Sequence, residues 1–155
     1  MAQIANDPQL VLKVTPPRIP KTVLERGRLS SARAEFSDKA VILLHAPTGS
    51  GKTALLAQWR KEALQTGAVV VWVTLDQRDH NNRLVRALVA AMRSSSGRPA
   101  FGVVSLRAAE SDQDALEGLT SWLAELAESA LETLLILDDI HALPEATLNT
   151  SLPYL

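Results

Sequence analysis

Residues 45–59 have the sequence HAPTGSGKTALLAQW, which is the most informative segment of the chain about its fold. It follows a continuous apolar run at residues 40–44, which is typical of a strand buried on both faces. After the glycines, apolar side chains recur at helical spacing and predict a helix over residues 51–65. A buried strand, a glycine-rich turn and a helix, in this order, indicate an α/β fold with a parallel sheet.

The glycine turn is suited to a polyphosphate, which needs converging backbone N–H donors, a helix N-terminus and one cation. The segment APTGSGKT matches the phosphate-binding pattern G-x-x-x-x-G-K-[ST], except that Ala46 stands in place of the first glycine. In that pattern the lysine reaches the β- and γ-phosphates and the hydroxyl binds Mg²⁺, which assigns these roles to Lys52 and Thr53. The alternative is a glycine turn that merely joins a strand to a helix.

We expect the nucleotide to contact the whole loop and the residue that follows it. Lys52 is expected both to bind the phosphates and to take part in catalysis. The expected nucleotide-binding residues of this stretch are Ala46, Pro47, Thr48, Gly49, Ser50, Gly51, Lys52, Thr53 and Ala54.

The second informative stretch, LLILDDIHAL, covers residues 134–143 and predicts a strand at residues 134–137 that runs into two acids. A carboxylate at the C-terminal end of a buried parallel strand lies where α/β sheets bind ligands. We therefore expect Asp138, together with the Thr53 hydroxyl, to bind Mg²⁺, and Asp139 to orient or deprotonate the attacking water. Taken alone, such a run is commonly an ordinary boundary between a strand and a loop.

The other segments continue the alternation of strands and helices. Residues 1–38 are expected to form an extended N-terminal arm and a lead-in helix, because four early prolines exclude a continuous helix, and residues 39–155 a partial P-loop NTPase core. The further expected elements are a helix at 22–36 capped by Thr22, strands at 69–75 and 101–106, and helices at 83–93 and 114–129, the last opened by a capping box of Ser111 and Asp114. The expected fold class is α/β, a three-layer P-loop NTPase with helices on both faces of a parallel sheet.

Composition limits the possible functions. The chain has 155 residues, of which 46% are apolar, and this is enough for one globular core. It contains no cysteine, so disulfides and thiolate metal sites are excluded. It has neither a signal-peptide pattern nor an apolar run of the about 20 residues that a membrane helix needs. We therefore expect a soluble, cytoplasmic protein without membrane contact.

Charge is distributed unevenly along the chain. The net charge of −1 argues against nucleic-acid binding by electrostatics alone. All 16 Lys and Arg lie within residues 1–107, whereas residues 108–155 contain ten acids and no base. One interpretation is structural: the two parts pack against each other, or an acidic helix faces water. The other is functional: the basic part attracts a polyphosphate, and acids of the other part hold its metal.

Three segments, APTGSGKT, VWVTLDQRDHNN and LLILDDIHAL, together resemble the N-terminal nucleotide-binding module of the MalT-type ATP-dependent regulators, which are large LuxR-type transcription factors in the STAND class of P-loop ATPases. The arm, KVTPPRIPKTVLERGRL, is similar to the lead-in of that family, in which an arginine touches the nucleotide; here it would be Arg26. The resemblance spans about residues 13–143. It leaves the roles of Asp76 and Asp79 open.

This resemblance implies ATP or ADP with Mg²⁺ as cofactors and a switch that depends on the bound nucleotide. It also implies possible self-association in the active state, and DNA binding only through a C-terminal domain that these residues do not include. Two alternatives remain: a stand-alone P-loop enzyme such as a small kinase, and a STAND-type protein whose effector domain does not bind DNA. An interaction protein with a degenerate nucleotide site is disfavoured, because Lys52, Thr53 and Asp138 are all present.

The resemblance further implies that the sequence is truncated before the sensor strand, which in this class lies between the strand before the phosphate loop and the strand bearing the acid pair. We therefore expect residues 40–44 and 134–137 to be separated by a slot about two strand spacings wide, ~9.5 Å, or else to be forced into direct pairing. Such a piece is expected to be poorly soluble or marginally folded and to have little ATPase activity of its own.

Overall fold

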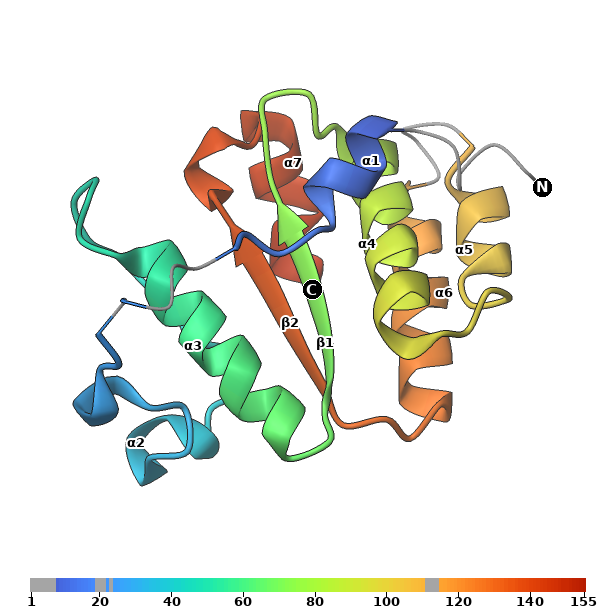
Figure 1. Cartoon of the computed structure of the whole chain (residues 1–155). Coiled ribbons are helices and arrows are strands. Elements are labelled where there is room, and N and C mark those ends of the chain that lie inside the picture. Colours follow the sequence, from blue (N-terminus) through green and yellow to red (C-terminus); the bar gives the residue numbers. More distant parts are fainter. Residues whose placement is uncertain (1–7, 19–21, 23, 111–114) are drawn as a thin grey trace.

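The computed structural model describes residues 8–18, 22, 24–110 and 115–155 (Figure 1). Its centre is a two-stranded parallel sheet of β1 (Val69–Thr74) and β2 (Thr133–Asp138). Both strands were predicted from their apolar runs, and both predictions are confirmed. The register pairs Val69 with Thr133 and Thr74 with Asp138, so both strands end together at one edge of the sheet.

Helices and short 3-10 turns make up most of the remaining described chain. The helices are α1 (Pro8–Lys13), α2 (Ala34–Ser37), α3 (Lys52–Gln65), α4 (Asn81–Ser96), α5 (Val103–Ala108), α6 (Ala115–Glu128) and α7 (Glu145–Thr150). The 3-10 turns are η2 (Gly27–Leu29), η4 (Ile140–Ala142) and η5 (Leu152–Tyr154). The predicted helices at 51–65, 83–93 and 114–129 correspond to α3, α4 and α6, while the capping box of Ser111 and Asp114 lies outside the described residues.

The sheet is covered on both faces, as Figure 1 shows. Alternate residues of a strand point to opposite faces, and β1 follows this rule. Val70 and Trp72 form a small buried cluster with Ile136, packed against α3. Val71 and Val73 belong to a larger core that includes the buried apolar faces of α4 and α6. The predicted three-layer arrangement is therefore present around a sheet of two strands.

Residues 40–44 do not form the predicted strand. The segment is assigned no regular structure, and the side chains of Val41 and Leu43 are 82% and 76% exposed. A strand requires a neighbour that pairs with its backbone N–H and C=O groups. Within the described residues β2 pairs with β1 and not with this segment, so the apolar run is left without a partner, and the direct pairing considered above does not occur.

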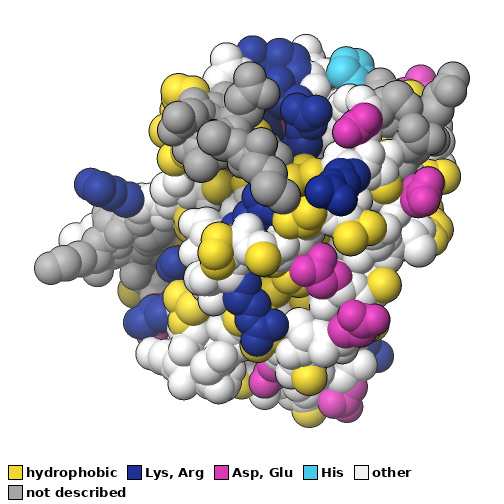
Figure 2. Space-filling model, turned by 90° about the vertical axis from the view of Figure 1, so that its right-hand side faces the viewer, with side chains coloured by type: hydrophobic (Ala, Val, Ile, Leu, Met, Phe, Trp, Pro, Cys, Tyr) yellow, Lys and Arg dark blue, Asp and Glu magenta, His cyan; other side chains and the backbone are white. Residues whose placement is uncertain are grey.

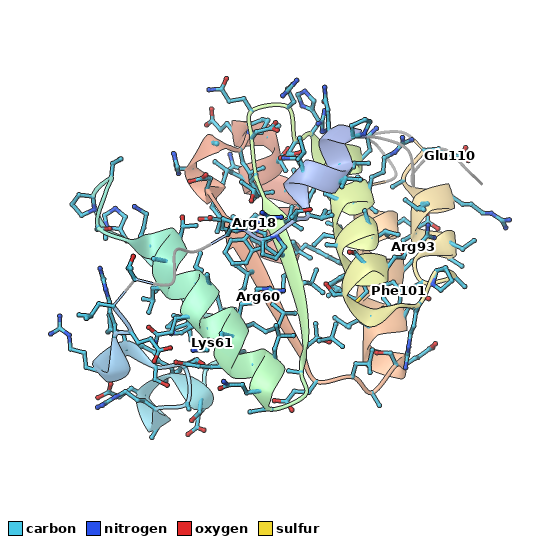
Figure 3. The ribbon with its side chains drawn as sticks, in the orientation of Figure 1. Arg18, Arg60, Lys61, Arg93, Phe101 and Glu110 are labelled. Atoms are coloured by element: carbon cyan, nitrogen blue, oxygen red, sulfur yellow. The ribbon has the colours of Figure 1, made fainter. Side chains whose placement is uncertain are left out.

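The strand predicted at residues 101–106 is also wrong, because this segment contains α5. Gly102 has a φ of +73° and breaks the extended chain immediately before the helix. Its N–H donates to Glu125 Oε2 at 2.8 Å, and Arg93 Nε donates to the Phe101 carbonyl at 2.6 Å (Figure 3). The Phe101 ring meets the buried Trp122 edge-on, with centroids 6.2 Å apart. Contacts from α4 and α6 thus shape a segment whose local sequence suggested a strand.

Where the structure describes the lead-in, residues 22 and 24–36, it has η2 and the short α2 in place of the continuous helix predicted at 22–36. Hydrogen bonds to α3 hold this backbone instead of hydrogen bonds within a helix. Trp59 Nε1 donates to the Leu29 carbonyl at 2.6 Å, and Ser31 N–H and Oγ donate to Glu62 Oε2 at 2.8 and 2.6 Å. The arm also differs from the fully extended form expected, because α1 begins at Pro8, and proline is tolerated in the first turn of a helix.

The packing of α5 against α6 depends on Gly118, where a Cβ atom would lie 2.8 Å from Ala109 Cβ and 3.0 Å from the Ser105 carbonyl oxygen. In an exposed helix, Gly→Ala stabilises by about 1 kcal/mol. We predict the opposite sign here: Gly118→Ala should lower the free energy of unfolding by about 1–3 kcal/mol through overpacking. Gly27→Ala, where nothing lies within 4 Å of the added Cβ, is the control and should change it by less than about 0.5 kcal/mol. Urea denaturation of both variants decides, and a stabilised Gly118→Ala protein would contradict the packing.

The attachment of the lead-in should depend on pH. Burial raises the pKa of Glu62, but hydrogen bonds from the Ser31 and Gln58 side chains and the Ser31 N–H outweigh it and lower the pKa below its usual value. The unfolded chain therefore takes up this proton first as the pH falls below about 4, and the contribution of Glu62 to stability, complete above that pH, is lost. We predict that Glu62→Gln makes the free energy of unfolding less sensitive to acidification between about pH 6 and about pH 3. Equal pH sensitivity of both proteins in denaturant titrations would refute this.

Candidate functional site

The glycine loop lies at the edge of the sheet where both strands end. Gly49 and Gly51 have φ values of +81° and +85°, a conformation that glycine adopts without strain and that turns the chain into α3. Gly51 is the N-cap of α3, so the amides of the first helical turn have no preceding helical carbonyls to bond with. Ser50 Oγ is buried and has no hydrogen-bond partner among the described residues. The loop therefore offers several donors to a ligand.

Lys52 lies across this loop. Its Nζ donates to the Ala46 carbonyl at 2.7 Å and to the Pro47 carbonyl at 3.1 Å. It forms no ion pair with an acid of the described chain, so its charge is balanced only by carbonyl dipoles. Pro47, Thr48 and Gly49 form the exposed tip of the loop, and the residues from Ser50 onward are partly buried. An ammonium group placed in this way can exchange its two hydrogen bonds to carbonyls for stronger ones to an anion.

Arg26 is brought to the loop by the lead-in. Its Nη2 donates to the Ser50 carbonyl at 2.9 Å, and a Cβ at Gly51 would lie only 2.8 Å from the same nitrogen. Its backbone N–H donates to Gln58 Oε1 at 2.8 Å, and Gln58 Nε2 donates in turn to Glu62 on the next turn of α3. The guanidinium has five N–H donors, and its position against the loop leaves some of them available to a ligand there.

The acid pair lies at the end of β2, and its two members differ in environment. Asp138 is 7% exposed, and its Oδ1 accepts hydrogen bonds from Thr53 Oγ1 at 3.4 Å and from the Asp139 N–H at 3.1 Å. Asp139 adopts a left-handed conformation, with φ of +59°, and its side chain is half exposed, 3.9 Å from His141 Nδ1. The fold thus joins Thr53 and Asp138, which are 85 residues apart, and leaves Asp139 half exposed next to them.

A buried ionic cluster beside this pair was not anticipated from the sequence. Lys13 Nζ, at the end of α1, donates to the Thr74 carbonyl at 2.7 Å, to Asp76 Oδ2 at 3.1 Å and to Asp79 Oδ2 at 2.5 Å. Asp79 is fully buried, and its Oδ1 lies 3.4 Å from Arg83 Nε without hydrogen-bond geometry. The only sequence signal was the pair of aspartates, Asp76 and Asp79, after β1. No local pattern connected them to a lysine more than 60 residues away.

The charge of Asp76 reflects the same cluster. Burial raises the pKa of this carboxyl group, but the hydrogen bond from the Arg78 N–H and the Lys13 ammonium outweigh it, and the pKa lies below its usual value. Asp76 therefore carries a negative charge at the edge of the site at neutral pH. Its charge is offset locally by Lys13 and by Arg78 Nε at 3.8 Å.

A cavity of about 590 Å³ opens between the arm and the carboxyl ends of the strands. Its lining comes from the arm, the start of α3 and the segments that follow both strands: Gln9, Leu12, Lys13, Thr15, Pro17, Thr53, Thr74, Leu75, Asp76, Arg78, Arg83, Asp138 and Asp139. Of the glycine loop, only Thr53 lines this cavity. Another cavity, of about 520 Å³, lies at the far end of α4 and includes no residue of the loop. Because only the first contains the Thr53–Asp138 pair, we take it as the candidate site.

Charge on the surface is also segregated. Figure 2 shows Lys and Arg side chains at the top of the face in view and also at its left and lower centre, whereas acidic side chains lie mainly in the right half of the view. The uneven charge of the sequence is thus retained in the folded chain.

The donor set fits a nucleotide with Mg²⁺. Lys52, the uncapped start of α3 and the unpartnered Ser50 hydroxyl are suited to phosphate oxygens. Mg²⁺ is usually held by one or two protein oxygens together with phosphates and water. The Thr53 hydroxyl and the Asp138 carboxylate, in contact at the mouth of the loop, form such a pair.

Comparison with known proteins gives a family and distant relatives. The chain is 29% identical over 141 residues to the serine/threonine-protein kinase PknK of Mycobacterium tuberculosis (strain H37Rv), covering 90% of this chain and 13% of that protein. It is 28% identical over 144 residues to the HTH-type transcriptional regulators MalT of Yersinia enterocolitica and of Serratia proteamaculans, covering 90% of this chain and 15% of each. The chain thus spans only about a seventh of the length of these relatives. No solved structure matches it.

Among the described residues, none of the helices has both the length and the apolar character of a membrane span.

The similarity to MalT agrees with the resemblance based on the three motifs. The similarity to PknK extends this resemblance to a second kind of protein. Residues 25–155 match the AAA ATPase domain family, whose fold is the P-loop NTPase α/β fold. Since this match covers most of the sequence, the chain belongs to the AAA ATPase domain family.

Proposed function

We propose that this chain is the ATP- or ADP-binding switch module of a signal-responsive transcriptional regulator and that it binds nucleotide together with Mg²⁺. The observation that carries the proposal is the contact between Thr53 Oγ1 and Asp138 Oδ1, which joins the start of α3 to the end of β2. A hydroxyl at a phosphate-binding helix and a carboxylate at a strand end are the usual protein ligands of the metal in P-loop NTPases.

In this proposal each residue near the loop has one task. Lys52 leaves the carbonyls of residues 46 and 47 and binds phosphate oxygens, together with the loop amides and the Ser50 hydroxyl. Thr53 and Asp138 hold Mg²⁺, which when bound would neutralise phosphate charge. Asp139, half exposed beside them, orients or deprotonates water. Arg26 contributes a second cation from the lead-in.

A switching role is supported by the number of segments that contribute residues to the site. These segments are the arm, the lead-in, the loop and the ends of two strands. A ligand that contacts several such segments favours the arrangement in which they are close together, and so shifts the conformational population. PknK and MalT are named as a kinase and a transcriptional regulator, and the chain matches a small part of each. This supports a module that operates with different effectors. DNA binding and self-association would belong to the remainder of the regulator.

The first test is nucleotide binding. Lys52→Ala should weaken ATP or ADP binding by about 2 kcal/mol or more, about thirtyfold, because charge-assisted hydrogen bonds to phosphate are lost. Lys61→Ala is the matched control, because Lys61 lies on the same helix (Figure 3) and its exposed side chain pairs with Glu25. Calorimetric titration in the presence of Mg²⁺ measures both variants. Unchanged affinity in Lys52→Ala would refute the assigned site.

The second test separates the two acids. Asp138→Asn should weaken Mg²⁺-dependent nucleotide binding, because a metal ligand and the acceptor of the Thr53 hydrogen bond are altered. Asp139→Asn should preserve binding and slow ATP hydrolysis by about 100-fold or more in the full-length protein, since general base catalysis typically contributes that much. Binding with and without Mg²⁺ and steady-state phosphate release provide the comparison. If both variants lost the same function, the division of roles would be wrong.

A further inference from the structure

The buried Lys13 has an unusual position for a residue of a terminal arm. Its side chain is 4% exposed and bonds to the carbonyl of Thr74, the last residue of β1, and to two carboxylates in the segment that follows β1. Burying an ammonium group is costly unless it is paired and hydrogen-bonded, and here both conditions are met. The arm is therefore attached in two ways: Leu10, which is 6% exposed, packs into the large apolar core, and the Lys13 ammonium group bonds to the sheet edge, whereas Leu12 between them is 76% exposed.

The attachment lies directly beside the proposed metal ligands. Thr74, whose carbonyl accepts from Lys13, is the register partner of Asp138, and the Leu75 N–H donates to the Asp138 carbonyl at 2.9 Å. Arm residues Leu12, Thr15 and Pro17 line the same cavity as Asp138. In Figure 1 the arm (dark blue) crosses over the arrowheads of both strands. The arm thus forms one wall of the cavity at its metal end.

The segment after β1, which contains Asp76 and Asp79, also accepts hydrogen bonds from residues that follow the acid pair. Thr147 Oγ1 donates to the Asp79 carbonyl at 2.9 Å, and Ser151 Oγ donates to Asn81 Oδ1 at 2.7 Å. Thr147 belongs to α7, which follows the acid pair. Asp79 therefore connects the arm, through its carboxylate, to the segment after Asp139, through its carbonyl.

We propose that Lys13 is a positioning residue that holds the arm over the metal end of the cavity and so slows release of the Mg²⁺-bound nucleotide. This inference rests on the proposed function. Lys13 acts in two ways: its ion pairs keep the arm closed, and its charge offsets Asp76 and Asp79, which would otherwise repel the phosphates. Removing it should affect the dissociation rate more than the association rate.

The test measures dissociation of a fluorescent ADP analogue, mant-ADP, with Mg²⁺ by stopped flow in the full-length protein. Lys13→Met, which keeps the length and removes the charge, should release mant-ADP about tenfold faster. Lys39→Met, at an exposed position, is the control and should leave the rate unchanged. A native rate in Lys13→Met would overturn the proposal.

A second variant separates positioning from stability. Lys13→Met leaves the buried Asp79 uncompensated and is expected to lower the melting temperature, whereas Lys13→Met/Asp79→Asn removes both charges and should recover much of it. We expect release to remain fast in the double variant, because the ion pairs that hold the arm over the cavity are still absent. A return to the native rate would mean that Lys13 is only structural and would refute the proposal, even if the single variant fails to fold. Lys52→Ala tests the proposed function separately. If this variant binds mant-ADP as tightly as the native protein does, the proposed function itself fails.

Discussion

The parallel register of β1 and β2 is the constraint on which the rest of this structure depends. It aligns Thr74 with Asp138, so the segments after both strands leave the sheet at one edge. Thr53 and Lys13 each contact one of these two strand ends. A shift of one residue in this pairing would turn the side chains of one strand to the opposite face and would separate the hydroxyl, the carboxylate and the ammonium group.

The two faces of the sheet are stabilised differently, and this difference bears on function. The face under α4 and α6 has a large apolar core, including the fully buried Trp122 and Met92. The face under α3 has only a small apolar cluster, and α3 is joined to the lead-in by hydrogen bonds of Glu62 and Trp59 and by the contact of the Phe36 and Trp59 rings. Polar contacts of this kind contribute modestly to net stability. The glycine loop is therefore attached to the less extensively packed side of the molecule, which suits the proposed site, whose parts would rearrange around a ligand.

Polar connections also link segments that are distant in sequence. The buried Asp79 requires a cation, because an unpaired carboxylate in the interior is strongly unfavourable, and Lys13 meets that need from the arm. Its backbone carbonyl bonds to α7, and its neighbour Asp76 faces the cavity. The buried Asp79 thus connects the arm with the segment after the acid pair, next to the cavity. The family match over residues 25–155 does not include Lys13, so the arm extends the site beyond the matched domain.

The sequence by itself determined the elements whose signals are local: the β-branched run of β1, the apolar run of β2 that ends in two acids, and the helical periodicity of α3, α4 and α6. It also indicated the glycine loop with Lys52, because a turn with positive φ has a characteristic composition. Only the tertiary structure decided the rest. Residues 40–44 have the composition of a strand but pair with no other strand of the described chain, and residues 101–106 are shaped by contacts from α4 and α6. The partners of Lys13 are more than 60 residues away. Hydrogen-bond pairing and burial depend on which segments meet in space, and no local pattern contains that information.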